Sequence, residues 1–311
     1  MIKLIGSRLL VLPLLLLLLS SLIFALLYLL PGDPARIMAG EYASAETVDR
    51  IRVQMGFDRH PVIQYLTYVR DVLQGEWGRS YQSNRLVLED IKQVFPKTIK
   101  ITLVAEIMSI ILGVSFGVLA AVRRNSWIDR SLMTVSVLSL SMPLFWLALL
   151  LQLLFAMRLG WLPPSGSGDL FSRYIILPAL TLAIPSSGYL ARITRAAMLD
   201  TQQADYVLTA RSKGLREFSV ITKHMLPNAW LPIISVIGVD LARLLAGVAI
   251  IEVIYAWPGL GKYAFDALAH RDFPALQASL NVLAAAVLFV NLGSDVLYGL
   301  ADPRVRAEEN A

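Results

Sequence analysis

Long apolar stretches alternate with shorter polar ones along the whole chain. About 20 consecutive apolar residues are needed to cross the hydrocarbon core of a bilayer as a helix. The pattern predicts an all-α polytopic membrane protein with six transmembrane helices, at residues 9–30, 99–122, 132–157, 174–193, 229–251 and 276–300. Pro143 predicts a kink in the third span. Pro178 and Pro185 interrupt the fourth, where neighbouring helices must satisfy the backbone groups that proline leaves free.

A long segment of mixed charge separates the first two spans, and within it residues 45–55 and 62–73 are compatible with helices. We therefore divide the chain into an N-terminal transmembrane helix (1–30), an extracytoplasmic region (31–98) and a five-helix core (99–311). Lys3 and Arg8 precede the first apolar stretch, as in a signal peptide. That stretch exceeds the usual length of about 7–15 residues and lacks an A-x-A cleavage pattern, so we expect an uncleaved span.

The composition agrees with a membrane location. Hydrophobic residues make up 56% of the chain and charged residues only 16%, whereas soluble domains carry about 25% charged residues. Cysteine is absent and the three histidines are scattered, so neither a disulfide framework nor a thiolate metal site is expected. The net charge of +5 comes from residues beside the spans, and no nucleic-acid partner is predicted.

The basic residues favour one orientation, because cytoplasmic loops of membrane proteins carry an excess of Lys and Arg. With the N-terminus inside, the two short outer loops hold only Arg158, Arg173, Lys262 and Arg271. We therefore predict that both termini are cytoplasmic. The cytoplasmic segments then hold Lys3, Arg8, Arg123, Arg124, Arg130, Arg192, Arg195, Arg211, Lys213, Arg216, Lys223, Arg304 and Arg306.

The segment between the fourth and fifth spans, about residues 194–228, is polar, basic and too long for a simple turn. Its spacing predicts a short surface helix that Gly214 ends, because glycine readily adopts the left-handed conformation of a helix C-terminus. The small side chain of Ala210 would let a partner approach closely. The residues alone leave a docking helix and a lipid-held amphipathic loop equally open. The candidate residues are Asp205, Tyr206, Ala210, Arg211, Lys213, Gly214, Leu226 and Pro227.

The spacing of Ala210, Gly214, Leu226 and Pro227 resembles the cytoplasmic "EAA" loop of ABC-importer permeases. The chain departs from the name-giving pattern, since Leu208 stands at the glutamate position. The form D-Y-V…A-R-x-K-G-L is similar to the dipeptide/oligopeptide/nickel branch, which tolerates that loss. Further motifs similar to that branch follow in order at residues 75–80, 141–148, 161–163, 176–178, 191–192, 252, 257–261, 271–274, 295 and 302–304.

This resemblance implies a type I ABC-importer permease of the inner (plasma) membrane, which is a transport subunit and not an enzyme. Its solutes would be di- or oligopeptides or a related small solute, with nickel, metal chelates or glutathione as alternatives within the branch. The implied partners are a second homologous permease, two ABC ATPase subunits and an extracytoplasmic solute-binding protein. The 194–228 loop would hold the helix that docks on an ATPase. No cofactor is expected on this chain, with ATP and Mg bound by the ATPase subunits.

Glu106, Asp240 and Arg243 place ionisable groups inside predicted spans, where such groups mark pathways by default. Asp240 and Arg243 are three residues apart and share one helix face. Two interpretations stay open: the wall of a water-filled translocation path, or a structural ion pair between helices. An ion-coupled secondary transporter is the alternative function. An intramembrane protease is disfavoured, since no histidine falls inside a span.

The outer loop after the fifth span combines Glu252 with Trp257, Pro258, Gly259 and Gly261. We expect Glu252 to fix the loop. The loop itself either closes the outer mouth of the path, reaches toward a docked binding protein, or is a plain turn. Residues 259–262 faintly resemble a phosphate-binding loop, but the first glycine of that motif is missing and Tyr263 replaces its Ser or Thr.

Overall fold

The structure is a computed structural model that describes residues 2–29, 32–40, 42–169 and 172–301. It divides into two compact units. The core unit comprises residues 1–6, 99–257 and 287–311, and the N-terminal unit comprises residues 7–98 and 258–286. The basic tail residues Arg304 and Arg306 and the 302–304 motif lie outside the described residues.

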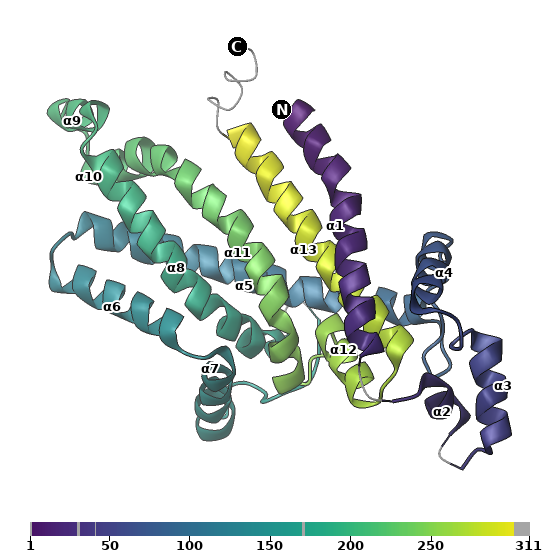
Figure 1. Cartoon of the computed structure of the whole chain (residues 1–311). Helices are drawn as coiled ribbons and strands as arrows, with labels where there is room; N and C mark the ends of the chain where they lie inside the picture. The colour runs from purple at the N-terminus through teal and green to yellow at the C-terminus, as the bar shows by residue number, and fades with distance from the viewer. Residues whose placement is uncertain (1, 30–31, 41, 170–171, 302–311) are drawn as a thin grey trace. The chain divides into compact units, whose positions relative to one another are not determined.

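The N-terminal unit is helical (Figure 1). Both stretches expected to be helical between the first two spans, 45–55 and 62–73, are confirmed as α3 and α4. Ser44 caps α3 by accepting a hydrogen bond from the backbone N–H of Thr47 at 3.3 Å, and Gly56 ends it at φ 71°. The elements are most of α1 (Ile2–Tyr28), α2 (Pro34–Ala39), α3 (Ala45–Met55), α4 (Pro61–Leu73), the start of α5 (Val87–Val122), α12 (Leu260–Ala269) and the first part of α13 (Phe273–Ala301).

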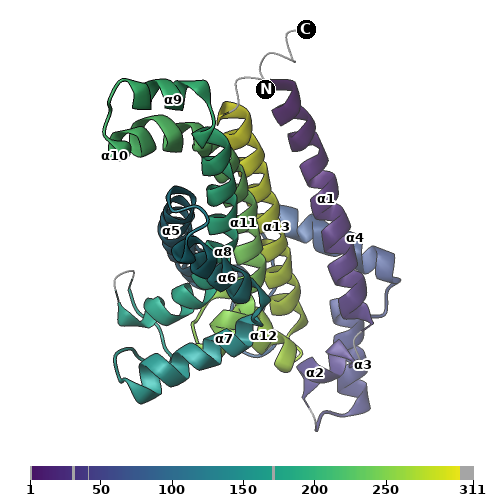
Figure 2. The same cartoon turned by 90° about the vertical axis from the view of Figure 1, so that its left-hand side faces the viewer.

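The core unit is a helical bundle in which α8 and α11 lie side by side, as both views show (Figures 1 and 2). The short helices α9 and α10 pack against each other beside the ends of α8 and α11 (Figure 2). Besides the rest of α5 and α13, the elements are α6 (Trp127–Ser141), α7 (Leu144–Leu151), a π-helix (Gln152–Arg158), a 3₁₀ turn (Arg173–Ile175), α8 (Ile176–Gln202), α9 (Asp205–Ser212), α10 (Glu217–Val220), a π-helical turn (Ile221–Met225) and α11 (Leu226–Ile254).

Five helices among the described residues are long and apolar enough to cross a membrane, or up to six if the bent pair α6–α7 counts as one span. The predicted third span, 132–157, is therefore wrong as a single kinked helix, because the two helices meet at 109°. The cause lies at Pro143. Its ring excludes the preceding residue from the helical region, and Met142 is extended, with ψ 129°.

The fourth span is a more continuous helix than its prolines suggested. Pro178 lies in the first turn of α8, where no intrahelical partner exists for a backbone N–H. Pro185 lies inside the helix, yet the helix continues from Ile176 to Gln202. Of its most apolar window, 72% is buried against other helices, which supply the packing that propensity does not.

Glycine lets α5 and α8 approach closely. A Cβ added at Gly113 would lie 2.8 Å from the Cβ of Leu190, and one at Gly117 would lie 2.4 Å from the Cβ of Thr194. The G-x-x-x-G spacing of this span is thus a helix-packing seam. Gly188 of α8 plays the same part toward α6, since a Cβ there would lie 2.2 Å from the Oγ of Ser139.

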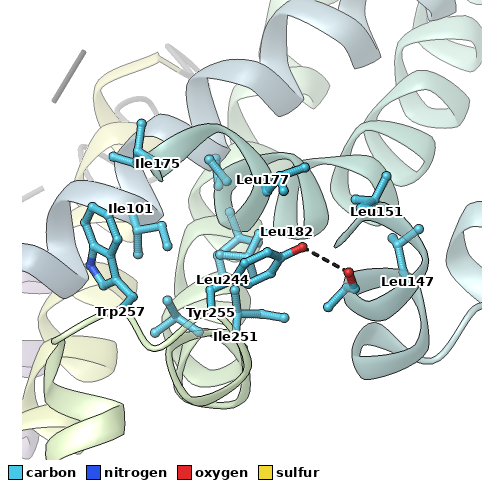
Figure 3. Packing of buried hydrophobic residues seen from close by; sticks show 14 residues of the cluster. Ile101, Leu147, Leu151, Ile175, Leu177, Leu182, Leu244, Ile251, Tyr255 and Trp257 are labelled. Carbon is cyan, nitrogen blue, oxygen red and sulfur yellow. Dashed lines mark hydrogen bonds between the residues drawn. The ribbon is translucent and has the colours of Figure 1, made fainter. Parts of the chain in front are cut away.

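An ion pair and an apolar cluster hold the core unit together. Arg195 on α8 donates from Nε and Nη2 to the two carboxylate oxygens of Asp129 on α6, at 2.6 and 2.8 Å. The largest apolar cluster surrounds Tyr255, whose hydroxyl donates to the carbonyl of Ala148 at 3.1 Å (Figure 3). Its labelled members are Ile101, Leu147, Leu151, Ile175, Leu177, Leu182, Leu244, Ile251, Tyr255 and Trp257.

Candidate functional site: a charged cluster and a surface helix

Two of the ionisable residues predicted in the spans form an ion pair within α11. Nε and Nη2 of Arg243 donate to the same oxygen of Asp240, Oδ1, at 2.9 and 2.5 Å. Nη2 also donates to the hydroxyl of Ser186 on α8 at 3.0 Å. The expected common helix face is confirmed, and the pair that Asp240 and Arg243 form lies within α11 and not between two helices. α8 contributes a neutral acceptor instead.

Glu106 of α5 completes the cluster. Its side chain is buried, and Asp240 and Arg243 both lie within electrostatic range of it. Neither carboxylate oxygen has a hydrogen-bond partner within the described part of the chain. The cluster therefore places two carboxyl groups beside one guanidinium. Buried polar groups are usually satisfied, so this carboxyl is a candidate for a functional position.

One side of this cluster is open. The Asp240 side chain is 4% exposed, but the Arg243 side chain is 49% exposed. The guanidinium carbon of Arg243 lies 6.0 Å from the ring centroid of Tyr189, which suits a cation–π contact. A charged side chain facing lipid in mid-membrane costs at least about 2.5–3.5 kcal/mol. This face of α8 and α11 must therefore be covered by water or by protein.

The predicted surface helix exists as α9, Asp205–Ser212, and Lys213 is its C-cap. Gly214 follows at φ 74°, so it occupies the left-handed conformation that its residue type suggested. Leu226 and Pro227 begin α11, with the proline in the first turn. The geometry predicted for this segment is thus confirmed.

The expected role of Ala210 needs correction. Together with Val207 it is buried in an apolar cluster with α8 and α11 residues of this same chain. Its small side chain therefore serves packing within the permease and does not offer a surface for a partner. The exposed apolar side chains on α9 are Tyr206 and Leu208, at 44% and 52% exposure.

Arg211 has a partner that sequence reasoning missed. Its Nε and Nη2 donate to the two carboxylate oxygens of Glu217 at 3.1 and 2.6 Å, which ties α9 to α10. The carboxylate raises the pKa of Arg211. Such a fork-to-fork pair is geometrically specific. Phe218, one residue further along the chain, is 77% exposed and adds an exposed apolar side chain on α10.

The loop after the fifth span is built differently from the expectation. Glu252 and Trp257 are fully buried in the core unit, at 0% and 1% exposure. Trp257 belongs to the apolar cluster of Figure 3, so it does not reach toward a binding protein. Glu252 holds the loop through its backbone carbonyl, which accepts from the N–H of Trp257 at 2.8 Å.

In the N-terminal unit the chain continues from Pro258 directly into a helix. Gly259 is the N-cap of α12, and Gly261 is buried in its first turn. Of the interpretations left open for this loop, the plain turn is wrong, because α12 lies between the fifth and sixth spans. Gly259 has φ −98°, which any residue can adopt, so backbone conformation does not require glycine there.

Two of the motifs that carry the family resemblance meet in the N-terminal unit. The hydroxyl of Ser80 donates to Oδ2 of Asp272 at 2.5 Å, although the residues are 192 positions apart. Oδ1 of Asp272 accepts from the N–H of Ala275 at 3.4 Å, in the first turn of α13. Local spacing could not reveal this contact, and the joint occurrence of both motifs was the only available signal.

Comparison with known proteins identifies the class of this arrangement. Residues 113–307 match the family "Binding-protein-dependent transport system inner membrane component", and residues 1–102 match the N-terminal family of the same transport components. The glutathione transport system permease protein GsiC of Salmonella paratyphi A is 40% identical over 291 residues, 94% of each chain. A putative peptide transport system permease protein of Brucella abortus is 40% identical over 296 residues, 93% of this chain and 94% of the relative.

Among solved structures, an inward-facing MetNI methionine ABC transporter chain matches with a TM-score of 0.60 over 69% of this chain and 97% of that one. Its 17% identity supports the fold alone. The sequence matches cover nearly the whole length of the chain. They rule out the alternative functions of a secondary transporter and an intramembrane protease. The chain belongs to the binding-protein-dependent inner membrane components, as the permease subunit of an ABC importer whose ATP hydrolysis takes place on separate subunits.

Proposed function

We propose that this permease carries peptide-like solutes, either short peptides or glutathione, across the inner membrane. Relatives of nearly equal length bear the names of glutathione and peptide transport permeases. Such solutes carry both ammonium and carboxylate groups. The charged cluster offers both complementary charges, which favours these solutes over a purely apolar one. Nickel or metal chelates remain the alternative cargo, to be tested by uptake in the same assay.

The observation that carries this proposal is the half-exposed guanidinium of Arg243 in the middle of α11. Contact of this guanidinium with lipid is unfavourable, and Asp240 pairs with it from the buried side only. We assign Arg243, Asp240 and Glu106 to the wall of the translocation path. Solute groups would then meet the open side of Arg243, with the Tyr189 ring beside them.

The assembly that we propose contains this chain, a second homologous permease, two ABC ATPase subunits and an extracytoplasmic binding protein. ATP and Mg would bind only to the ATPase subunits. Tyr206, Leu208 and Phe218 supply the exposed apolar surface on which one ATPase would dock. Both chain termini would be cytoplasmic, as the distribution of basic residues favours.

Substituted cysteines test the path, since the chain contains none of its own. Tyr189→Cys lies beside Arg243, whereas Ile107→Cys is the matched control next to Glu106 on α5. The side chain of Ile107 is 56% exposed on a segment that we expect to face lipid. A small hydrophilic thiol reagent should modify Tyr189→Cys and spare Ile107→Cys. Addition of the binding protein with solute and ATP should change the rate of modification at position 189.

Transport measurements complete the test. Asp240→Asn and Arg243→Gln should reach the membrane and assemble with the ATPases, but should change the uptake rate or the preference among labelled solutes. If both variants instead disappear from the membrane and exchanging the two charges restores them, the cluster is structural. Equal modification of Tyr189→Cys and Ile107→Cys would also contradict the path assignment.

A further inference from the structure

A second site of different character lies within the N-terminal unit. A cavity of about 580 Å³ is lined by residues from α1, α3, α4, α13 and the segments between them. This volume falls in the range of about 300–1,000 Å³ that is typical of small-molecule sites. None of the charged cluster of the core unit lines this cavity, so the cavity is a separate site from the proposed path.

Aromatic side chains supply much of the apolar wall. Phe57, Trp77, Tyr81 and Phe273 all line the cavity, and Tyr68 does so as well. The hydroxyl of Tyr68 accepts a hydrogen bond from Nδ2 of Asn281 at 2.7 Å. Burial raises the pKa of Tyr68 to about 12, so at neutral pH the phenol keeps its proton and can donate it.

The charged groups of the wall fall into two kinds. Asp33 is engaged with Arg52 at 2.5 Å, and Asp71 with Arg70 at 2.7 Å. Glu76 and Arg59 also line the cavity, but within the described residues neither side chain has an ion-pair or hydrogen-bond partner. One carboxylate and one guanidinium of the cavity lining therefore remain available.

Arg59 is placed by its neighbour. Its side chain lies across Gly56, where an added Cβ would be 3.2 Å from Nε of Arg59. Gly56 itself adopts φ 71° at the end of α3. The glycine thus combines a left-handed turn with a gap that the guanidinium side chain occupies. Arg59 is exposed overall, and this contact sets its side chain beside the turn at Gly56.

From this geometry we infer that the cavity binds a small zwitterion with an apolar body, of the kind that a dipeptide presents. Its ammonium would pair with Glu76, its carboxylate with Arg59, and its apolar side chains with the aromatic wall. This site would hold solute in the N-terminal unit independently of the charged cluster. A zwitterionic phospholipid headgroup shares the same charges, so the experiment must separate the two sources.

The test uses the assembled importer in nanodiscs of phosphatidylcholine and phosphatidylglycerol, without binding protein or ATP. Equilibrium binding is measured for radiolabelled alanylphenylalanine, its N-acetyl form and its amide form. Glu76→Gln and Arg59→Gln should each weaken binding of the free dipeptide about tenfold or more, as expected for loss of one charge-assisted hydrogen bond. The N-acetyl form should bind equally to the wild type and Glu76→Gln, and the amide form equally to the wild type and Arg59→Gln.

Glu46→Gln and Arg50→Gln are the matched controls, because this exposed pair lies on α3 outside the cavity wall. Both should bind like the wild type. Absence of dipeptide binding, or unchanged binding in Glu76→Gln and Arg59→Gln, would overturn the inference. If phosphatidylethanolamine copurifies with the wild type but not with these two variants, and displaces the dipeptide, the occupant is a lipid and the solute assignment is wrong.

Discussion

Replacing Gly117 with alanine should loosen the contact between α5 and α8. The added Cβ would lie 2.4 Å from the Cβ of Thr194 and 2.7 Å from the carbonyl oxygen of Ala191. Ordinary contact begins near 3.4 Å, so the helices would have to separate by roughly 1 Å. Overpacking of this kind costs about 1–3 kcal/mol, and the better helix propensity of alanine returns about 1 kcal/mol at most.

Gly293 of α13 is the matched control, because a Cβ there meets nothing within 4 Å. Gly293→Ala should therefore keep or raise stability, since only the propensity gain of about 1 kcal/mol remains. The assay is thermal denaturation of the detergent-purified importer, followed by size-exclusion chromatography. We expect the midpoint of Gly117→Ala to fall below that of the wild type by a few degrees, and Gly117→Val to fall further. If Gly117→Ala were as stable as Gly293→Ala, the close approach of α5 and α8 would be wrong.

An impermeant thiol reagent applied to sealed cells should label Tyr42→Cys, which is 98% exposed, and should spare Ser212→Cys on α9; the opposite pattern would reverse the proposed orientation. Leu208→Asp should prevent ATPase copurification while the permease stays in the membrane, whereas Ala210→Trp should reduce the amount of folded permease because its position is buried. Normal copurification of Leu208→Asp would exclude this surface as the docking site. Asp129→Asn should destabilise the core unit by about 2–3 kcal/mol in the thermal assay. This is less than the roughly 3–5 kcal/mol lost when a fully buried pair is broken, because the arginine partner is 26% exposed. An unchanged midpoint would show that the pair contributes nothing to stability.

Hydropathy located the spans because it reports contact with lipid, and it failed where helices continue beyond the bilayer. α5 begins at Val87 and not at residue 99, because Glu89, Asp90 and Lys92 in its first turns lower the hydropathy of a stretch that is nevertheless helical. The bend of α6 and α7 was foreseen as a kink at Pro143, but its size depends on the packing of both arms. Proline identity alone sets only the conformation of Met142.

The candidate site was predictable where it lies on one helix and not where it joins two. Spacing by three residues placed Asp240 and Arg243 on one face, and the structure pairs them. Ser186 on α8 and Glu217 beyond α9 could not be foreseen, because no local pattern encodes which helix lies opposite another. For the same reason the sequence suggested a close approach at Ala210 but not whether the neighbour was the chain itself or another protein.

The two faces of α9 have a consequence for building hybrid importers. Val207 and Ala210 face inward. A graft that alters them would disturb the packing of the recipient permease itself, independently of any contact with an ATPase. Tyr206 and Leu208 can be exchanged without touching that interior. A chimera intended to work with a foreign ATPase should therefore replace the exposed residues of α9 one at a time. It should keep the recipient permease's own alanine at position 210.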